Sequence, residues 1–129
     1  MFDMTGREAY PVLVVDMQAE ASRDRYESRP GRRAVVAADL AELRGPAEGM
    51  VKLPLWLYWS SPGHAFDLAD RDMRRWLYQT ALREAGRVED LAAYLDGGML
   101  IALWPDLYLP SGVRRAWEDQ HAVLRAAAA

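Results

Sequence analysis

One histidine and three aspartates stand within nine residues near the middle of the chain: His64, Asp67, Asp70 and Asp72. Carboxylate oxygens bind hard cations, and an imidazole beside them would favour zinc or manganese. A metal-dependent enzyme that uses His64, Asp67 and Asp70 is therefore one alternative. The spacing matches no established metal loop, however, and aspartate is also a preferred N-cap residue. We favour capping of a helix by Asp67 or Asp70, and we predict no metal and no cofactor.

A hydroxyl nucleophile and a base also stand close together in the sequence, at Ser60, Ser61 and His64. An acyl-transfer site needs a nucleophile elbow or an acid that orients the histidine, and the sequence identifies neither. Turn formation alone explains the Ser-Ser-Pro-Gly run. The absence of cysteine excludes disulfides, thiolate metal sites and cysteine catalysis. We therefore predict no catalytic residue and favour a non-enzymatic role over an enzyme.

Five arginines form the one basic cluster of the sequence: Arg23, Arg25, Arg29, Arg32 and Arg33. Such a cluster can bind phosphate groups even on an acidic domain. A nucleic-acid-binding regulator is thus the second alternative, with Arg29, Arg32 and Arg33 as its contacts. Two acidic residues interrupt the cluster, and the formal net charge of −3 gives no general attraction to nucleic acid. A solvated loop is the interpretation we favour.

Three large aromatic residues fall within four positions just before the Ser-Ser-Pro-Gly run. We predict a strand from Met50 to Trp59. Strand alternation places two sets of side chains on opposite faces, Leu53, Leu55, Leu57 and Trp59 on one and Trp56 and Tyr58 on the other. Both faces are apolar, so the strand is either buried on both sides or exposes an aromatic patch. We predict a partner-binding surface made by Trp56, Tyr58 and His64.

Hydrophobic periodicity predicts the elements that must hold these residues in place. Val12–Val15 reads as a strand, and Ala34–Arg44 as a helix that Gly45-Pro46 ends. Further helices are predicted over residues 68–85, 88–96 and 111–125, the last of them capped by Ser111. The fold class is therefore α+β. A small sheet that includes residues 11–15 and 51–59 packs against three or four helices, and the C-terminal half is mainly helical.

Length and composition are typical of a single globular domain. The 129 residues suffice for one core, and 51% hydrophobic with 27% charged residues is ordinary for a folded protein. We predict one domain over residues 1–129, with residues 1–10 and 126–129 frayed. No apolar run approaches the roughly 20 residues that span a bilayer. Without cysteine and without a signal-peptide pattern, the expected location is the cytoplasm.

Residues 53–117 carry a wider pattern of aromatic, turn and acidic residues. It consists of Leu57-Tyr58-Trp59-Ser60, Pro62-Gly63, Phe66-Asp67-Leu68, Tyr78, Leu82, Glu84, Asp90, Tyr94, Asp96, Leu103-Trp104, Leu107, Leu109-Pro110, Val113-Arg114 and Trp117. In this pattern the chain resembles a family of small, uncharacterised, mostly actinobacterial proteins. Such proteins can lie beside abortive-infection-type nucleotidyltransferase toxins, so the resemblance implies a toxin as the partner. It supplies no catalytic residue, and residues 1–50 lie outside it.

The aromatic segment and the lack of catalytic groups together predict a non-enzymatic protein–protein interaction module. The resemblance narrows this expectation to an antitoxin or an accessory partner in a toxin or defence system. A nucleic-acid-binding regulator and a metal-dependent enzyme are the two alternatives that the sequence leaves open.

Overall fold

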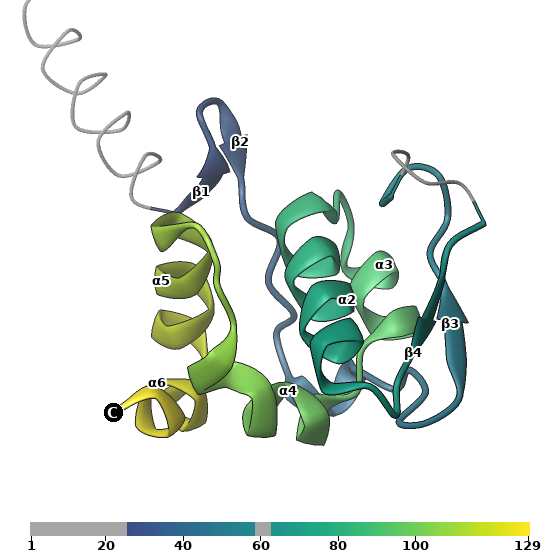
Figure 1. Cartoon of the computed structure of the whole chain (residues 1–129). Helices are drawn as coiled ribbons and strands as arrows, with labels where there is room; N and C mark the ends of the chain where they lie inside the picture. Colours follow the sequence, from purple (N-terminus) through teal and green to yellow (C-terminus); the bar gives the residue numbers. More distant parts are fainter. Residues whose placement is uncertain (1–25, 59–62) are drawn as a thin grey trace, which may run out of the picture.

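The computed structural model describes residues 26–58 and 63–129, and within them the fold is α+β, as predicted (Figure 1). Four short strands form two separate antiparallel pairs, β1 (Glu27–Arg29) with β2 (Arg32–Arg33) and β3 (Met50–Lys52) with β4 (Ala65–Asp67). The helices are α2 (Arg71–Glu84), α3 (Val88–Tyr94), α4 (Gly97–Leu103), α5 (Ser111–Gln120) and α6 (Ala122–Ala128). Two 3-10 turns, η1 (Leu40–Glu42) and η2 (Trp104–Asp106), complete the elements. The predicted strand over residues 11–15 lies outside the described residues.

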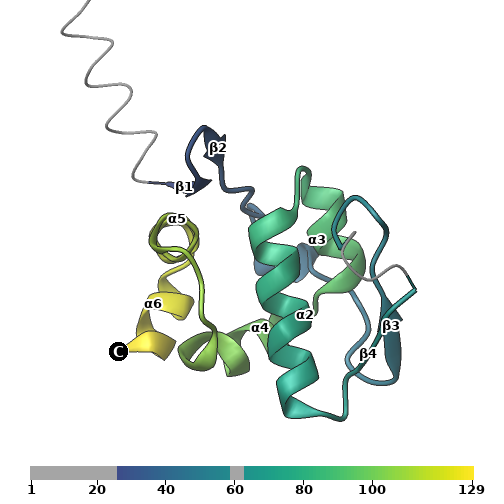
Figure 2. The same ribbon diagram turned by 45° about the horizontal axis from the view of Figure 1, so that its top comes forward.

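Helix α2 is central to the arrangement. The β3–β4 pair and α3 lie on one side of it, and α5 and α6 lie on the other (Figure 1). Figure 2 shows the same order of elements from a second direction, with α4 connecting the two sides. The C-terminal half is mainly helical, as the sequence predicts. None of the helices in residues 26–58 and 63–129 is long and apolar enough to cross a membrane.

The hydrophobic core forms where these elements meet. One side of α2 buries Leu77, Tyr78, Ala81 and Leu82. The largest fully buried side chains elsewhere include Phe66 from β4, Trp104 from η2 and Trp117 from α5. Of the four tryptophans among the described residues, Trp104 and Trp117 are therefore the two that the core encloses.

The predicted strand from Met50 to Trp59 ends at Lys52, so most of that prediction is wrong. The carbonyl of Pro54 accepts hydrogen bonds from the amides of Leu57 and Tyr58, each at 3.0 Å, and the chain turns. Proline has no amide hydrogen to donate to a strand ladder, so an extended conformation loses support at this point. The two alternating faces expected of a long strand are lost with it.

The strand partner of β3 is a segment that lies just before the predicted helix over residues 68–85, and no strand is predicted there. Ala65–Asp67 pairs with β3 in antiparallel register, and Val51 lies opposite Phe66. Both of these side chains are buried. The helix α2 begins only at Arg71, after Asp70 as its N-cap. Pairing with β3 places the ring of Phe66 in the core.

The predicted helix over Ala34–Arg44 is also absent, and the chain there is irregular except for η1 and a bridge between Arg44 and Asp96. Long-range hydrogen bonds satisfy its backbone. The carbonyl of Ala37 lies 2.7 Å from Nε2 of His121, and the amide of Arg44 donates to the carbonyl of Ala92 in α3 at 3.1 Å. Since these groups have partners elsewhere in the fold, helix formation offers them no advantage.

The C-terminal helical region differs from prediction in its capping and continuity. The sequence predicts one helix over residues 111–125 with Ser111 as N-cap, whereas α5 follows Pro110 as N-cap and gives way to α6 at His121. The backbone of His121 is extended, with φ −127° and ψ 101°. Helix α6 extends to Ala128, and the fraying of residues 126–129 stays a prediction.

Two glycines permit close approaches between elements. A Cβ atom at Gly112, in the first turn of α5, would lie 1.9 Å from the carbonyl oxygen of Glu27 in β1. A Cβ atom at Gly45 would lie 2.4 Å from the carbonyl carbon of Tyr94 at the end of α3. Any larger residue would therefore have to move backbone, which is costly in a packed domain.

Candidate functional site

The turn Pro54–Tyr58 exposes two large apolar side chains. Trp56 is 65% exposed and Leu55 is 58% exposed, whereas Leu57 is buried and anchors the turn in the core. The structure thus places Trp56 on the surface. It also places Leu55 there, although strand alternation predicts that Leu55 shares a face with the buried Leu57. Because the chain turns here, Leu55 and Trp56 both face solvent, whereas a strand would place them on opposite faces.

The indole of Trp56 is fixed in position by a carboxylate 34 residues away. Its Nε1–H donates to Oδ1 of Asp90 at 3.0 Å, and Arg87 Nη2 lies 3.3 Å from the same oxygen. Asp90 is only 4% exposed, in the first turn of α3. A buried carboxylate is costly unless it is paired and hydrogen-bonded, and the first turn of a helix favours negative charge. The indole N–H of Trp56 therefore supplies one of the hydrogen bonds that the buried Asp90 carboxylate needs. The same bond fixes the orientation of the Trp56 ring.

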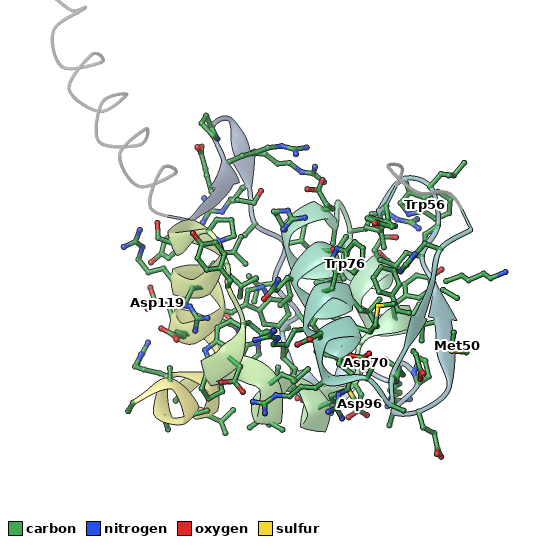
Figure 3. All side chains as sticks on the ribbon, viewed as in Figure 1. Met50, Trp56, Asp70, Trp76, Asp96 and Asp119 are labelled. Atoms are coloured by element: carbon green, nitrogen blue, oxygen red, sulfur yellow. The ribbon has the colours of Figure 1, made fainter. Side chains whose placement is uncertain are left out.

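A second group of aromatic rings lies between the turn, β4 and α2. Tyr58, His64, Phe66 and Trp76 contact one another with ring centroids from 4.6 Å to 5.9 Å apart. Most of these pairs are edge-to-face, the arrangement that aromatic quadrupoles favour. Trp76 remains 41% exposed on α2. Figure 3 shows Trp56 on the turn and Trp76 on α2.

The predicted partner-binding residues consequently separate into two kinds. Trp56 is a surface group, whereas Tyr58 and His64 are half-buried members of the ring cluster. Nε2 of His64 is buried and has no hydrogen-bond partner among the described residues, so the ring contributes packing. Sequence reasoning missed Leu55 and Trp76 as exposed apolar groups. It also missed Asp90, whose contact with Trp56 has no local sequence signal.

The aspartates of the metal alternative bind backbone amides. Asp70 Oδ1 accepts from the amides of Asp72 at 2.8 Å and Met73 at 3.2 Å, which confirms its prediction as the N-cap of α2. Asp67 Oδ1 accepts from the amide of Ala69 at 2.9 Å. Within the described ranges no group of three histidine, cysteine or acidic side chains is arranged to hold a metal ion. The serines of the predicted turn, at positions 60 and 61, lie outside those ranges.

The arginines of the nucleic-acid alternative have structural contacts. Arg29 Nη1 lies 3.4 Å from Oε1 of Glu84, and Arg32 Nη2 donates to the backbone carbonyl of the same residue at 2.6 Å. The guanidinium of Arg33 lies 5.5 Å from the centre of the Tyr26 ring. Two of the three predicted phosphate contacts therefore attach the β1–β2 pair to the C-terminal end of α2. Arg23 and Arg25 lie outside the described residues.

One titratable group in the core is strongly perturbed. Burial raises the pKa of Tyr78 to about 12, and the nearby Asp96 carboxylate acts in the same direction. The hydroxyl accepts a hydrogen bond from the Asp96 amide at 2.9 Å, which opposes the rise together with the Arg74 charge. The hydroxyl is enclosed in the core and bonds the N-cap residue of α4, so its role is structural.

Comparisons of the chain with protein-family models, with curated proteins and with solved structures found no match. The family resemblance of residues 53–117 stays a prediction. Function has to be argued from the exposed residues and their supports.

Proposed function

We propose that this protein is a non-enzymatic protein–protein interaction module whose contact surface is centred on Trp56. The Trp56 surface consists of Leu55, Trp56 and Trp76, with the half-buried ring of Tyr58 connecting the turn to α2. One observation carries the proposal. Trp56 is 65% exposed, and its indole N–H donates a hydrogen bond to the buried carboxylate of Asp90.

Such a fixed aromatic ring is suited to recognition. Tryptophan is enriched among the residues that dominate binding energy at protein interfaces. Ordering a side chain on binding costs roughly 0.5–1.5 kcal/mol, and that cost falls when the side chain is already held in one position. The Asp90 hydrogen bond holds the indole in this way and leaves most of the ring accessible. Leu55 adds adjacent apolar area that a partner would remove from water.

In this proposal the protein acts in the cytoplasm as the antitoxin or accessory partner of a toxin in a defence system. The resemblance of residues 53–117 supports that choice of partner. A nucleic-acid role has less support, because Arg29 and Arg32 are engaged with Glu84. A metal-dependent reaction likewise has less support, because Asp67 and Asp70 are occupied by backbone amides.

The proposal is tested with the product of the gene adjacent to that of this protein. We would measure its affinity for the wild-type chain and for Trp56→Ala by calorimetry. We expect a loss of about 2 kcal/mol, or roughly thirtyfold in Kd, because truncation of a central tryptophan typically has this effect. Val123→Ala is the matched control, since Val123 is exposed on α6, on the other side of α2.

Equal affinities of wild type and Trp56→Ala would contradict the contact surface. A wild-type chain that neither binds the adjacent product nor changes its activity would contradict the toxin as partner. Thermal unfolding of each variant shows whether a loss of affinity comes from the surface or from loss of the fold.

A further inference from the structure

The strand β3 has one edge that no other strand covers, here called the β3 edge. Its sheet contains only β3 and β4, so each strand has one paired edge and one further edge. The further edge of β4 faces α2, whereas β3 lies on the outer side of the pair (Figure 1, Figure 2). In the described part of the chain, the β3 edge is therefore open to an additional strand.

The hydrogen-bond pattern shows which backbone groups lie on the β3 edge. In an antiparallel pair, residues that bond to the partner strand alternate with residues whose amide and carbonyl point away from it. The amide of Leu68 in the β4 segment donates to the carbonyl of Gly49 at 2.9 Å, and Val51 lies two residues further along β3. Val51 therefore bonds to β4, while the amides and carbonyls of Met50 and Lys52 point to the β3 edge.

The side chains of the same residues give the β3 edge a chemical preference. Met50 is 63% exposed, and Lys52 is exposed as well. Since alternate residues of a strand share a face, these two side chains point to one side and the buried Val51 points to the other. Within residues 26–58 and 63–129, Lys52 forms no ion pair. The edge thus combines backbone donors and acceptors with one apolar side chain and one unpaired cation.

We propose that an extended segment of the partner protein adds to the β3 edge as a third strand. A carboxylate of that segment lies opposite Lys52, and an apolar side chain lies opposite Met50. Strand addition is an established mode of peptide recognition, in which main-chain hydrogen bonds give affinity and side chains give specificity. The inference rests on the function proposed above for its choice of a protein as ligand, and it adds the form of the contact.

The β3 edge and the Trp56 surface are neighbours in the fold. Lys52 is followed, after three residues, by Trp56. Figure 3 shows Met50 and Trp56 on one side of the molecule and Asp119 of α5 on the other. A single partner can therefore pair one segment with the β3 edge and place adjoining residues on the Trp56 surface.

Charge selects an acidic partner segment over a second copy of this chain. β3 consists of Met50, Val51 and Lys52, so a second β3 brings no carboxylate and adds another cation. Opposite charges across two strands stabilise their pairing, and like charges destabilise it. A lysine on an open edge also opposes unselective pairing with other strands. An extended segment that carries a carboxylate neutralises Lys52 and is the occupant that fits.

A defined peptide tests strand addition to the full chain. We would titrate the capped pentapeptide Thr-Glu-Thr-Ile-Thr and follow backbone amides by NMR. In an antiparallel arrangement its glutamate lies opposite Lys52 when its isoleucine lies opposite Met50. We expect saturable shifts of the Met50 and Lys52 amides, with a dissociation constant in the millimolar range because a short free peptide loses conformational freedom on binding.

Two methylated peptides supply a matched comparison. Methylation of the glutamate and isoleucine nitrogens removes the two hydrogens that face β3. Methylation of the central threonine nitrogen changes an amide that points away from β3. We expect the first change to weaken binding by about tenfold or more and the second by less than about twofold.

Three substitutions at Lys52 separate the charge from the backbone amide. We expect Lys52→Gln to weaken the peptide about twofold and Lys52→Glu about fivefold, and a peptide with lysine in place of glutamate should bind Lys52→Glu best. Lys52→Pro should weaken the peptide about tenfold beyond Lys52→Gln, because proline has no amide hydrogen. The fold should tolerate this proline, since the amide of Lys52 does not bond to β4. Thermal unfolding of the variant checks that it is folded.

Equal affinities for the two methylated peptides, or no binding of the parent peptide at millimolar concentration, would overturn strand addition. Shifts of the Met50 and Lys52 amides that grow with protein concentration alone would also overturn it, because a second copy would then occupy the β3 edge. These outcomes are distinct from a failure of the proposed function. An adjacent gene product that binds through Trp56, together with a peptide that does not bind, would remove strand addition alone.

Discussion

Trp56 and Asp90 form a pair in which the exposed residue and the buried residue stabilise each other. The indole N–H donates to the carboxylate at 3.0 Å, across 34 residues of sequence. Trp56 is the most exposed tryptophan of the described part of the chain, and Asp90 is one of its few buried charged residues. The bond connects the Pro54–Tyr58 turn to α3, so it contributes both to the fold and to the orientation of the proposed contact surface.

Removal of the Asp90 carboxylate should loosen Trp56 as well as destabilise the fold. We expect Asp90→Ala to lower the free energy of unfolding by about 1–3 kcal/mol, because it leaves the indole N–H and Arg87 without their partner. Solvent exchange of the Trp56 indole hydrogen, followed by NMR, should become faster. The Trp56→Phe variant assigns that signal. An unchanged exchange rate in Asp90→Ala would show that the bond does not hold the ring.

A side chain at Gly112 should be poorly tolerated. We expect Gly112→Ala to cost about 3 kcal/mol or more, because its Cβ atom would lie 1.9 Å from the Glu27 carbonyl oxygen and β1 would have to shift from α5. Gly86→Ala is the matched control, since the nearest atom there is 3.6 Å away at the end of the Arg32 side chain. Chemical denaturation of both variants measures the difference. Similar stabilities would contradict the close approach of β1 and α5.

Asp70 should behave as a helix cap rather than as a metal ligand. We expect Asp70→Ala to lower stability by about 1 kcal/mol, because the amides of Asp72 and Met73 lose their acceptor. Asp70→Asn should lose much less, since asparagine caps helices about as well. Thermal unfolding with zinc, with manganese and with a chelator completes the measurement. A stabilisation by either metal that Asp70→Asn abolishes would favour the metal alternative.

The buried Tyr78 hydroxyl should make stability fall at alkaline pH. Its pKa is raised to about 12 in the folded protein, against 10.0 in the unfolded chain. The unfolded state therefore releases its proton first, and the contribution is complete below about pH 10 and is lost as the pH rises toward about 12. The full loss is about 2–3 kcal/mol, from about 1.4 kcal/mol per pKa unit.

Tyr78→Phe supplies the control for that pH dependence. It removes the acceptor for the Asp96 amide, so we expect it to be less stable than wild type by about 1–3 kcal/mol near neutral pH. The difference in unfolding free energy between the two proteins should shrink between about pH 10 and about pH 12, because only the wild type has the tyrosine to ionise. A constant difference over that range would contradict the raised pKa.

The sequence predicted those parts of the fold in which hydrogen bonds and apolar contacts join residues only a few positions apart. The spacing of Met73, Trp76 and Leu77 predicts α2, and a short carboxylate before it predicts the cap that Asp70 provides. The α+β class follows from the same periodicities. These predictions hold because helix bonds and caps join residues only a few positions apart.

Contacts between distant residues decided what the sequence mispredicted. Ala34–Arg44 has the composition of a helix, but its backbone bonds to His121 and to the end of α3. Phe66 lies just before a predicted helix and has no predicted strand partner, but it pairs with Val51 across a strand ladder. In each case tertiary hydrogen bonds outweigh a local propensity that is worth less than about 1 kcal/mol per residue.

In the candidate site, too, local sequence predicts some features and contacts between distant residues decide the others. The sequence by itself determined that large aromatics are concentrated around positions 56–59, followed by a Ser-Ser-Pro-Gly run. Only the tertiary structure decided which rings face solvent: the turn at Pro54 cancelled the strand alternation, α2 and β4 enclosed Tyr58 and His64, and Asp90 fixed Trp56 at the surface. Exposure depends on which elements pack over a side chain, and that packing is set by residues remote in sequence.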